Sequence, residues 1–177
     1  MLSGKEKQNF ECAGGARYGP KVFMKCWALS KGYTHGNINA REAIKTSCNG
    51  FFYRYGNASG IDDILNVAKV MGLGEKSGIP LNNEDSGFIP NPEWKTAQGL
   101  GRWGDADTAL VSIGQGATEA TALQMAGVAA TTSNGGYYYK PRLIHKTVDM
   151  ASEELKSYEP LYSLADLGIT EEKLEIC

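Results

Sequence analysis

The stretch that decides the fold is Ala43-Ile44-Lys45-Thr46-Ser47-Cys48-Asn49-Gly50-Phe51-Phe52-Tyr53. Apolar residues in and around it recur at steps of three and four, which is the period of a helix with one buried face. Asn39 and Glu42 form a capping-box pattern at its start. The turn dipeptide Asn49-Gly50 interrupts the same periodicity. We therefore expect two helical pieces that meet between Ser47 and Gly50, with polar side chains at the junction.

Two more helices are predicted downstream, each with a polar cap before it and glycine after it. They are the helix from about Ile61 to Met71, between a Ser59–Asp62 capping box and Gly72 or Gly74, and the helix 119–133, between a Thr118 cap and Asn134-Gly135-Gly136. The other segments are expected to be irregular or extended. They are residues 1–36, the ordered excursion 75–104 pinned by Trp94 and Trp103, a strand at 108–113, and an edge strand at 137–148 that contains Pro141. The mixture is an α+β fold that is richer in helix.

Composition narrows the class of protein. The chain has 177 residues, of which 42% are hydrophobic, enough for one domain with a real core. Its 18 basic and 20 acidic residues nearly cancel, which removes the main argument for binding nucleic acid or an anionic membrane. No apolar run approaches the roughly 20 residues of a membrane helix, and residues 1–7 do not form a secretory signal. Residues 170–177 begin a helix pattern without room to finish, so we expect a truncated chain.

Three cysteines and one histidine lie in the first 48 residues: Cys12, Cys26, His35 and Cys48. Three thiolates with one imidazole are a common closed tetrahedral set for zinc. The spacing lacks a tight pair of cysteines, so disulfides and plain buried thiols are alternatives. Cys48 shares a helical stripe with Ile44 and Phe51, which predicts a sulfur that points inward. Cys177 is not expected to take part.

Ser47 and Asn49 form the second polar cluster, on either side of Cys48. A hydroxyl and a side-chain amide at a helix junction can face one cleft, where the hydroxyl relays protons and the amide holds an amide substrate. A simple turn with a capping asparagine is the alternative.

Other short segments lie on either side of Ser47-Cys48-Asn49. In chain order they are Phe10–Gly14, Cys26-Trp27, His35-Gly36, Gly72-Leu73-Gly74, Gly78–Leu81, Gly104-Asp105, Ile113–Gly116 and Thr121–Met125. In this order and spacing, the chain resembles class B penicillin-binding proteins up to about residue 148. It is most similar to elongation-type transpeptidases of the penicillin-binding protein 2 kind. The resemblance implies the penicillin-recognising serine transpeptidase fold, which is β-lactamase-like, and here mostly the helical part of it.

In that family, three motifs build a serine active site. Ser-x-x-Lys supplies the nucleophile, Ser-x-Asn corresponds to Ser47 and Asn49, and Lys-Thr/Ser-Gly lies on a strand. This sequence has no Ser-x-x-Lys, and neither Lys45-Thr46 nor Lys146-Thr147 is followed by glycine. The resemblance implies that the first motif lies upstream of residue 1 and the third beyond residue 177. We therefore expect an internal fragment of the transpeptidase domain.

The resemblance also implies a zinc ion beside the active site, because some elongation-type relatives hold one with ligands from the same four places. Those places carry Cys12, Cys26, His35 and Cys48 in this sequence. A bound metal would then brace the Ser47-Asn49 loop. A Cys12–Cys26 disulfide is the next alternative, since the family is extracytoplasmic.

The function that the resemblance implies is a peptidoglycan D,D-transpeptidase that cross-links stem peptides through a serine acyl-enzyme and is trapped by β-lactams. Ser47 would relay a proton toward the leaving amine, and Asn49 would hydrogen-bond the substrate amide. The parent would act at the periplasmic face of the bacterial inner membrane with elongation-machinery partners. With one motif of three, this chain is expected to be inactive alone. A non-catalytic, zinc-braced scaffold or interaction module derived from that fold is the alternative.

The expected organisation is one partial transpeptidase domain over residues 1–177. Within it we expect an irregular metal-binding segment at 1–36, a core at 37–148 and a truncated tail at 149–177.

Overall fold

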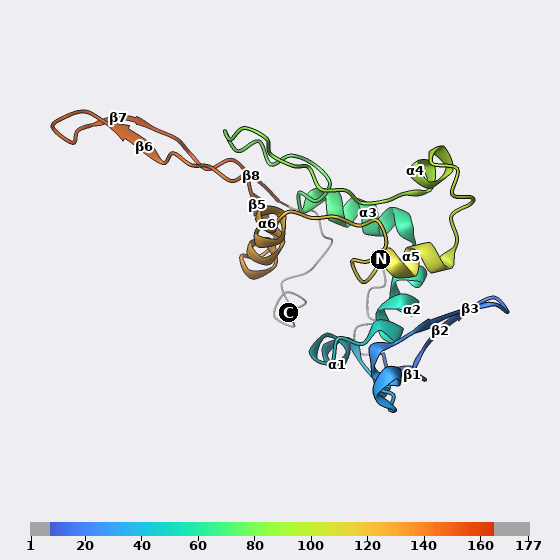
Figure 1. The fold of residues 1–177 in the computed structure, drawn as a ribbon. Coiled ribbons are helices and arrows are strands. Elements are labelled where there is room, and N and C mark those ends of the chain that lie inside the picture. Colours follow the sequence, from blue (N-terminus) through green and yellow to red (C-terminus); the bar gives the residue numbers. More distant parts are fainter. Residues whose placement is uncertain (1–7, 165–177) are drawn as a thin grey trace. The chain divides into compact units, whose positions relative to one another are not determined.

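The computed structural model describes residues 8–164 (Figure 1). The strands are β1 (Phe10–Cys12), β2 (Gly15–Tyr18), β3 (Val22–Lys25), β4 (Gly36–Ile38), β5 (Tyr137–Tyr139), β6 (Lys146–Val148), β7 (Glu154–Ser157) and β8 (Tyr162–Leu164). The helices are α1 (Ala40–Lys45), α2 (Asn49–Ser59), α3 (Ile61–Val70), α4 (Pro92–Ala97), α5 (Asp105–Val111) and α6 (Ala122–Ser133), with a 3₁₀ turn, η1, at Trp27–Lys31. The predicted helix start at residue 170 and Cys177 lie outside the described residues.

The described residues divide into two compact units. Residues 8–66 with 89–119 form the first, and residues 67–88 with 120–164 form the second. Each unit combines helices with two-stranded antiparallel pairs, as an α+β fold predicts. Between residues 8 and 164, no helix combines the length and the apolar character that crossing a membrane requires.

The first unit is organised around α2. This helix packs against β1, β2 and β3 on one side and against α5 on another (Figure 1). The strands before it pair as β1 with β4 and β2 with β3, in short antiparallel ladders. Phe51 is buried in the centre of this packing, together with the three cysteines of the first 48 residues. The prediction that residues 1–36 are irregular or extended is confirmed over residues 8–36, apart from the 3₁₀ turn η1.

The predicted break between two helices is confirmed. At the start of α1, the Asn39 side chain accepts a hydrogen bond from the Glu42 N–H (3.0 Å), and the Glu42 carboxylate accepts one from the Asn39 N–H (2.9 Å). This reciprocal pair satisfies two amides that the first turn of a helix leaves unpaired. The chain leaves α1 after Lys45 and begins α2 at Asn49, with Cys48 as the N-terminal cap.

Gly56 shows how closely α2 approaches α5. A β-carbon at this position would lie 2.3 Å from the β-carbon of Ser112, the C-terminal cap of α5. The Ser112 hydroxyl also donates a hydrogen bond to the Phe52 carbonyl of α2 (3.0 Å). Glycine is therefore the residue that allows this contact between the two helices.

The predicted strand at 108–113 is wrong, because residues 105–111 form α5. The Asp107 carboxylate accepts a hydrogen bond from the Gly104 N–H (2.8 Å), and the two acids in the first turn stabilise the start of a helix. A short, mostly apolar run cannot distinguish a buried strand from a buried helix by periodicity alone.

The predicted excursion 75–104 contains a helix that periodicity did not indicate, α4. Its start has clear signals, because Asn91 caps it by accepting from the Trp94 N–H (2.7 Å) and proline occupies the first helical position. The helix is only six residues long, too short to show a hydrophobic period.

Helix α3 is confirmed, with a difference at its start. Ser59, predicted to cap it, is instead the last residue of α2, and α3 follows after the single residue Gly60. At the other end, Gly72 adopts the left-handed conformation (φ 77°) and its N–H bonds to the Lys69 carbonyl (2.9 Å), as a glycine stop requires.

The start of α6 is corrected by three residues. Thr121, not Thr118, is the cap: its hydroxyl accepts from the Gln124 N–H (3.1 Å), and the Gln124 side chain accepts from the Thr121 N–H (2.9 Å). Both threonines can cap a helix, but only Thr121 has glutamine three residues later. The predicted stop at Asn134 is confirmed.

The predicted edge strand at 137–148 is two strands instead of one. β5 pairs with β8 and β6 pairs with β7, both antiparallel. Pro141 lies between β5 and β6, where its missing N–H breaks the ladder.

Candidate active site and metal centre

Four elements of the first unit bring the predicted metal ligands together. Cys12 ends β1, Cys26 immediately precedes η1, His35 immediately precedes β4, and Cys48 caps α2. The ladder between β1 and β4 pairs Cys12 with Gly36, which places Cys12 beside His35. The ligand atoms of all four residues lie within 4.8 Å of one another. The chain therefore gathers the Cys₃His set that its sequence predicts.

Two nitrogen–sulfur distances within this cluster are close to an edge of a zinc tetrahedron. His35 Nδ1 lies 3.5 Å from Cys26 Sγ and 3.8 Å from Cys12 Sγ. Zinc bonds of about 2.3 Å to sulfur and about 2.0 Å to nitrogen place two such ligands about 3.5 Å apart. The three cysteines are free thiols, each at most 2% exposed. His35 Nε2 is also buried and has no hydrogen-bond partner among residues 8–164. Soft, buried donors at these separations fit a zinc ion.

The pKa values of two of the thiols, Cys26 and Cys48, are shifted in opposite directions. Burial raises the pKa of Cys26, but hydrogen bonds from the N–H groups of Gly50, Ala28 and Asn49 outweigh it, so this pKa lies below its usual value. Burial raises the pKa of Cys48 to about 12, and the Phe51 N–H, 3.4 Å from the sulfur, offsets only part of this rise. Three thiolates in one buried cluster therefore require a cation beside them.

Gly50 lies where the first turn of α2 packs against the thiol cluster. A β-carbon there would lie 2.9 Å from Cys12 Sγ, closer than such atoms approach. The absence of a side chain lets the first turn of α2 lie directly on the thiol.

Ser47 and Asn49 lie on either side of this buried sulfur. Ser47 is exposed and its backbone is left-handed (φ 50°), which is an uncommon conformation for a residue with a side chain. Asn49 is partly buried as the first residue of α2. Burial raises the pKa of Tyr53, and a hydrogen bond with the Asn49 side chain lowers it in part. One hydrogen-bonding position of the Asn49 amide is thus used within the protein.

The expected stripe of Ile44, Cys48 and Phe51 is wrong in one member. Ile44 is 63% exposed, whereas Cys48 and Phe51 are buried. The helix breaks between Ile44 and Cys48, so the two residues do not share a face. The Cys48 sulfur points inward because Cys48 caps α2, where its sulfur accepts the Phe51 N–H.

Sequence reasoning missed the contact between Trp27 and the junction. The indole N–H of Trp27 lies 2.9 Å from the Ser47 carbonyl and 3.1 Å from the Thr46 carbonyl. The only sequence signal is the position of Trp27 next to the predicted ligand Cys26. A contact between residues twenty positions apart has no local pattern.

The sequence also contains one tripeptide, Lys76-Ser77-Gly78, with the residue types of a Lys-Ser-Gly variant of the third motif. It lies in an irregular segment of the second unit, not on a strand. The Ser77 hydroxyl donates to the Glu84 carboxylate (2.5 Å), which also accepts the Ser77 N–H (2.7 Å) and the Gly78 N–H (3.1 Å). The Ser77 hydroxyl and the N–H groups of Ser77 and Gly78 therefore stabilise the loop in which the tripeptide lies.

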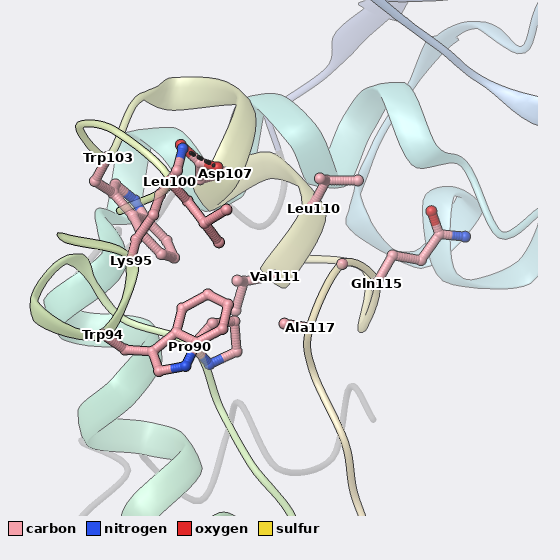
Figure 2. Close-up of a pocket in the computed structure, with 11 residues that line it drawn as sticks. Pro90, Trp94, Lys95, Leu100, Trp103, Asp107, Leu110, Val111, Gln115 and Ala117 are labelled. Atoms are coloured by element: carbon pink, nitrogen blue, oxygen red, sulfur yellow. Dashed lines mark hydrogen bonds and ion pairs between the residues drawn. The ribbon is translucent and has the colours of Figure 1, made fainter. Parts of the chain in front are cut away.

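A separate cavity of about 240 Å³ lies between α4 and α5 (Figure 2). Its walls are mostly apolar and include Trp94, Trp103 and Pro90. Figure 2 shows the ion pair between Lys95 and Asp107 (2.6 Å) at one edge. None of the predicted site residues lines this cavity.

Comparison with known proteins finds similarity to penicillin-binding protein transpeptidases over most of the chain. The family model described as the penicillin binding protein transpeptidase domain matches residues 3–172. The peptidoglycan D,D-transpeptidase MrdA of Acinetobacter baumannii is 41% identical over 113 residues, which cover 64% of this chain and 17% of MrdA. MrdA of Escherichia coli strain K12 is 34% identical over 119 residues, 67% of this chain and 19% of that protein. The matched part of the chain thus covers less than a fifth of the length of these relatives.

Solved structures agree on the fold. The penicillin-binding protein PBP2 of Helicobacter pylori matches 97% of this chain and 30% of its own, with a TM-score of 0.73 and 26% identity. The solved neighbours are penicillin-binding protein transpeptidase domains, and this chain has the mixed helix and strand content that was predicted, which together confirm the fold class.

Proposed function

The chain belongs to the penicillin-binding protein transpeptidase family, and on this basis we propose that it is part of a peptidoglycan D,D-transpeptidase to which Ser47 and Asn49 contribute the second active-site motif. The observation that carries the proposal is the family match over residues 3–172, which includes a Ser-x-Asn sequence at the break between two helices. A break at this point presents the Ser47 hydroxyl to solvent while Cys48 stays buried.

The proposed reaction is acyl transfer through a serine outside this chain. That serine oxygen attacks the carbonyl of a D-alanyl-D-alanine peptide bond, the terminal D-alanine leaves as an amine, and a second stem peptide's amine later displaces the serine. The Ser47 hydroxyl can both accept and donate a proton, which suits it to pass one to the leaving amine. The Asn49 amide keeps further hydrogen-bonding positions for a substrate amide beyond the one used with Tyr53.

The proposed setting follows the relatives. A complex of PBP2 with MreC from Helicobacter pylori matches 96% of this chain and 28% of its own, with a TM-score of 0.75 and 24% identity. We propose that the parent protein works at the periplasmic face of the inner membrane with elongation-machinery proteins of this kind, and that it binds stem peptides and β-lactams. We also propose that residues 1–177 form one partial transpeptidase domain, with a metal-binding segment at 1–36, a core at 37–148 and a tail at 149–177.

A fluorescent penicillin tests this assignment. The 177-residue chain should form no covalent adduct, because it has no Ser-x-x-Lys and Ser47 has no lysine to activate it. The full-length product of the same gene should be labelled at a serine outside these residues. A label mapped to a serine of this chain, or an unlabelled full-length product, would contradict the proposal.

A second proposal concerns the metal: Cys12, Cys26, His35 and Cys48 hold one zinc ion that braces the Ser47-Asn49 loop. Four ligand atoms within 4.8 Å, with His35 Nδ1 facing the Cys12 and Cys26 sulfurs, support it. Bound zinc would supply a structural cross-link between β1, η1 and α2, not a reaction step. If the chain acts without the other two motifs, this cross-link makes it a zinc-braced scaffold or interaction module.

A further inference from the structure

We propose that Trp27 is a positioning residue for Ser47, and that its indole N–H holds the Ser47 peptide in the conformation that presents the hydroxyl. The inference rests on the proposed function, because it assigns Trp27 to the motif that Ser47 and Asn49 form.

The Trp27 indole N–H donates to the carbonyls of the two residues before the buried Cys48. The indole N–H is shared between the Ser47 carbonyl at 2.9 Å and the Thr46 carbonyl at 3.1 Å. Both carbonyls follow the end of α1, where the helix ladder no longer provides donors. The shared donor therefore fixes the orientation of two successive peptide groups around Ser47.

The backbone at Ser47 needs such a restraint. Its φ of 50° is in the left-handed region, which residues with side chains adopt at some energetic cost. A conformation of this kind persists when surrounding contacts impose it. Trp27 supplies one such contact, and the bond from the Cys48 N–H to the Ala43 carbonyl (2.9 Å) supplies another.

Cys26 holds the other side of the same junction. The N–H groups of Asn49 and Gly50 donate hydrogen bonds to its sulfur. Two adjacent residues, Cys26 and Trp27, thus contact the backbone on both sides of Cys48. Cys26 accepts from the start of α2, and Trp27 donates to the end of the α1 segment.

The indole itself is oriented by aromatic neighbours. Its ring meets the rings of Tyr33 and His35 edge to face, with centroid separations of 5.7 and 5.4 Å. Trp27 is nevertheless 40% exposed, so filling the core does not explain its position. Its directed contact with the junction is the specific role that the structure assigns to it.

Substitution of Trp27 by phenylalanine removes the donor and keeps a ring against Tyr33 and His35. In the isotope-labelled chain we expect the ¹³Cα and ¹³Cβ shifts of Ser47 to leave their left-handed values. Amide exchange at residues 47–49 should rise roughly tenfold, the effect of losing a typical hydrogen bond on a local opening equilibrium. Exchange elsewhere in α2 should stay unchanged.

Trp103→Phe is the matched control. Trp103 lies in the same unit and also donates one indole hydrogen bond, to the Thr108 hydroxyl at 2.8 Å. Its substitution should leave the Ser47 shifts unchanged. The inference would be overturned if Trp27→Phe left the chemical shifts and amide exchange of Ser47 unchanged. It would also be overturned if Trp103→Phe changed them equally.

The unmodified chain provides a test that does not depend on a variant folding. The Trp27 indole proton should exchange slowly with solvent although the residue is 40% exposed, because it is hydrogen-bonded. Exchange at the rate of free tryptophan would overturn the inference.

The full-length gene product separates this inference from the proposed function. If Trp27 positions Ser47, Trp27→Phe should lower the first-order rate constant of acylation by penicillin roughly tenfold, with little change in the affinity of the preceding complex. An unchanged rate constant would overturn the role of Trp27 while leaving the transpeptidase assignment intact. Absence of acylation in the unmodified protein would instead refute the proposed function and, with it, the role of Trp27 in catalysis.

Discussion

The α1–α2 junction at residues 46–50 and the loop at residues 75–87 are both held in place by side-chain contacts. At the junction, the contacts come from Trp27 and from a cluster of buried thiols. In the loop, they come from Glu84 and from Gln124, whose side-chain amide donates to the Glu75 and Ser86 carbonyls at 2.9 and 2.7 Å. If the thiols hold a metal ion, the junction depends on that ion, whereas the contacts of the loop are hydrogen bonds within the protein.

Metal removal should give the largest difference between these segments. If zinc joins the four ligands, a chelator should raise amide exchange at residues 46–50 by roughly 100-fold or more, because a structural zinc site contributes folding free energy directly. Exchange in the loop at 75–87 should change little. Hydrogen exchange followed by mass spectrometry resolves the two segments. Equal loss of protection in both segments, or no loss in either, would contradict the proposed difference between the junction and the loop.

Gly50→Ala should destabilise the first unit by roughly 1–3 kcal/mol, because the new methyl group would overlap Cys12 Sγ. Gly127→Ala is the matched control in the second unit. Its β-carbon would meet only the edge of the Tyr138 ring at 3.2 Å, and alanine favours the helix by up to ~1 kcal/mol. Urea unfolding of both variants measures the difference. A Gly50→Ala variant as stable as the parent would show that the thiol can move away.

Gln124→Ala should act on the loop and on the capping box at the start of α6, and should leave the α1–α2 junction unchanged. Gln124 is 4% exposed, so its loss leaves the Glu75 and Ser86 carbonyls without a buried donor, at a cost of roughly 1–3 kcal/mol. Amide exchange at 75–87 should rise while exchange at 46–50 stays as it was. If residues 46–50 respond as strongly, the two segments are not independently held.

The smallest effect expected is a pH dependence of the loop. The Ser77 hydroxyl, followed by the N–H groups of Ser77 and Gly78, lowers the pKa of Glu84. Since the folded pKa lies below the unfolded one, the stabilisation is present above the unfolded pKa and is lost as pH falls through the folded value. Carbon-detected NMR titration of Glu84 should show this low pKa, and Ser77→Ala should raise it. An identical titration in both proteins would contradict the assigned cause.

Local patterns predicted the parts of the fold that local interactions determine. The Asn39–Glu42 capping box is confirmed because its hydrogen bonds join residues three apart. The predicted break between two helices lies at residues 46–48, just before the Asn49-Gly50 dipeptide, which begins α2. α5 was mistaken for a strand, since its run is short and apolar and its cap depends on Asp107. Local sequence therefore predicts caps and breaks better than the type of a short buried element.

The sequence predicted which residues form the candidate site but not the contacts that bring them together. Residue type alone selected Cys12, Cys26, His35 and Cys48, and only the pairing of β1 with β4 and the approach of α2 bring them together. The reason that Cys48 points inward was wrong, because it is a cap and not part of the Ile44 stripe. Trp27 was missed since its bond to Ser47 depends on tertiary distance.

The central claim is that the Cys₃His cluster holds zinc and thereby braces the Ser-x-Asn junction. Elemental analysis of the chain, purified without added metal, tests it most directly, with Cys48→Ser as the comparison. We predict about one equivalent of zinc in the parent, because a closed four-ligand site binds one ion. The variant should lose most of this zinc, because only three ligands remain. Less than a few tenths of an equivalent in the parent, or equal zinc in both, would contradict the claim and favour a Cys12–Cys26 disulfide.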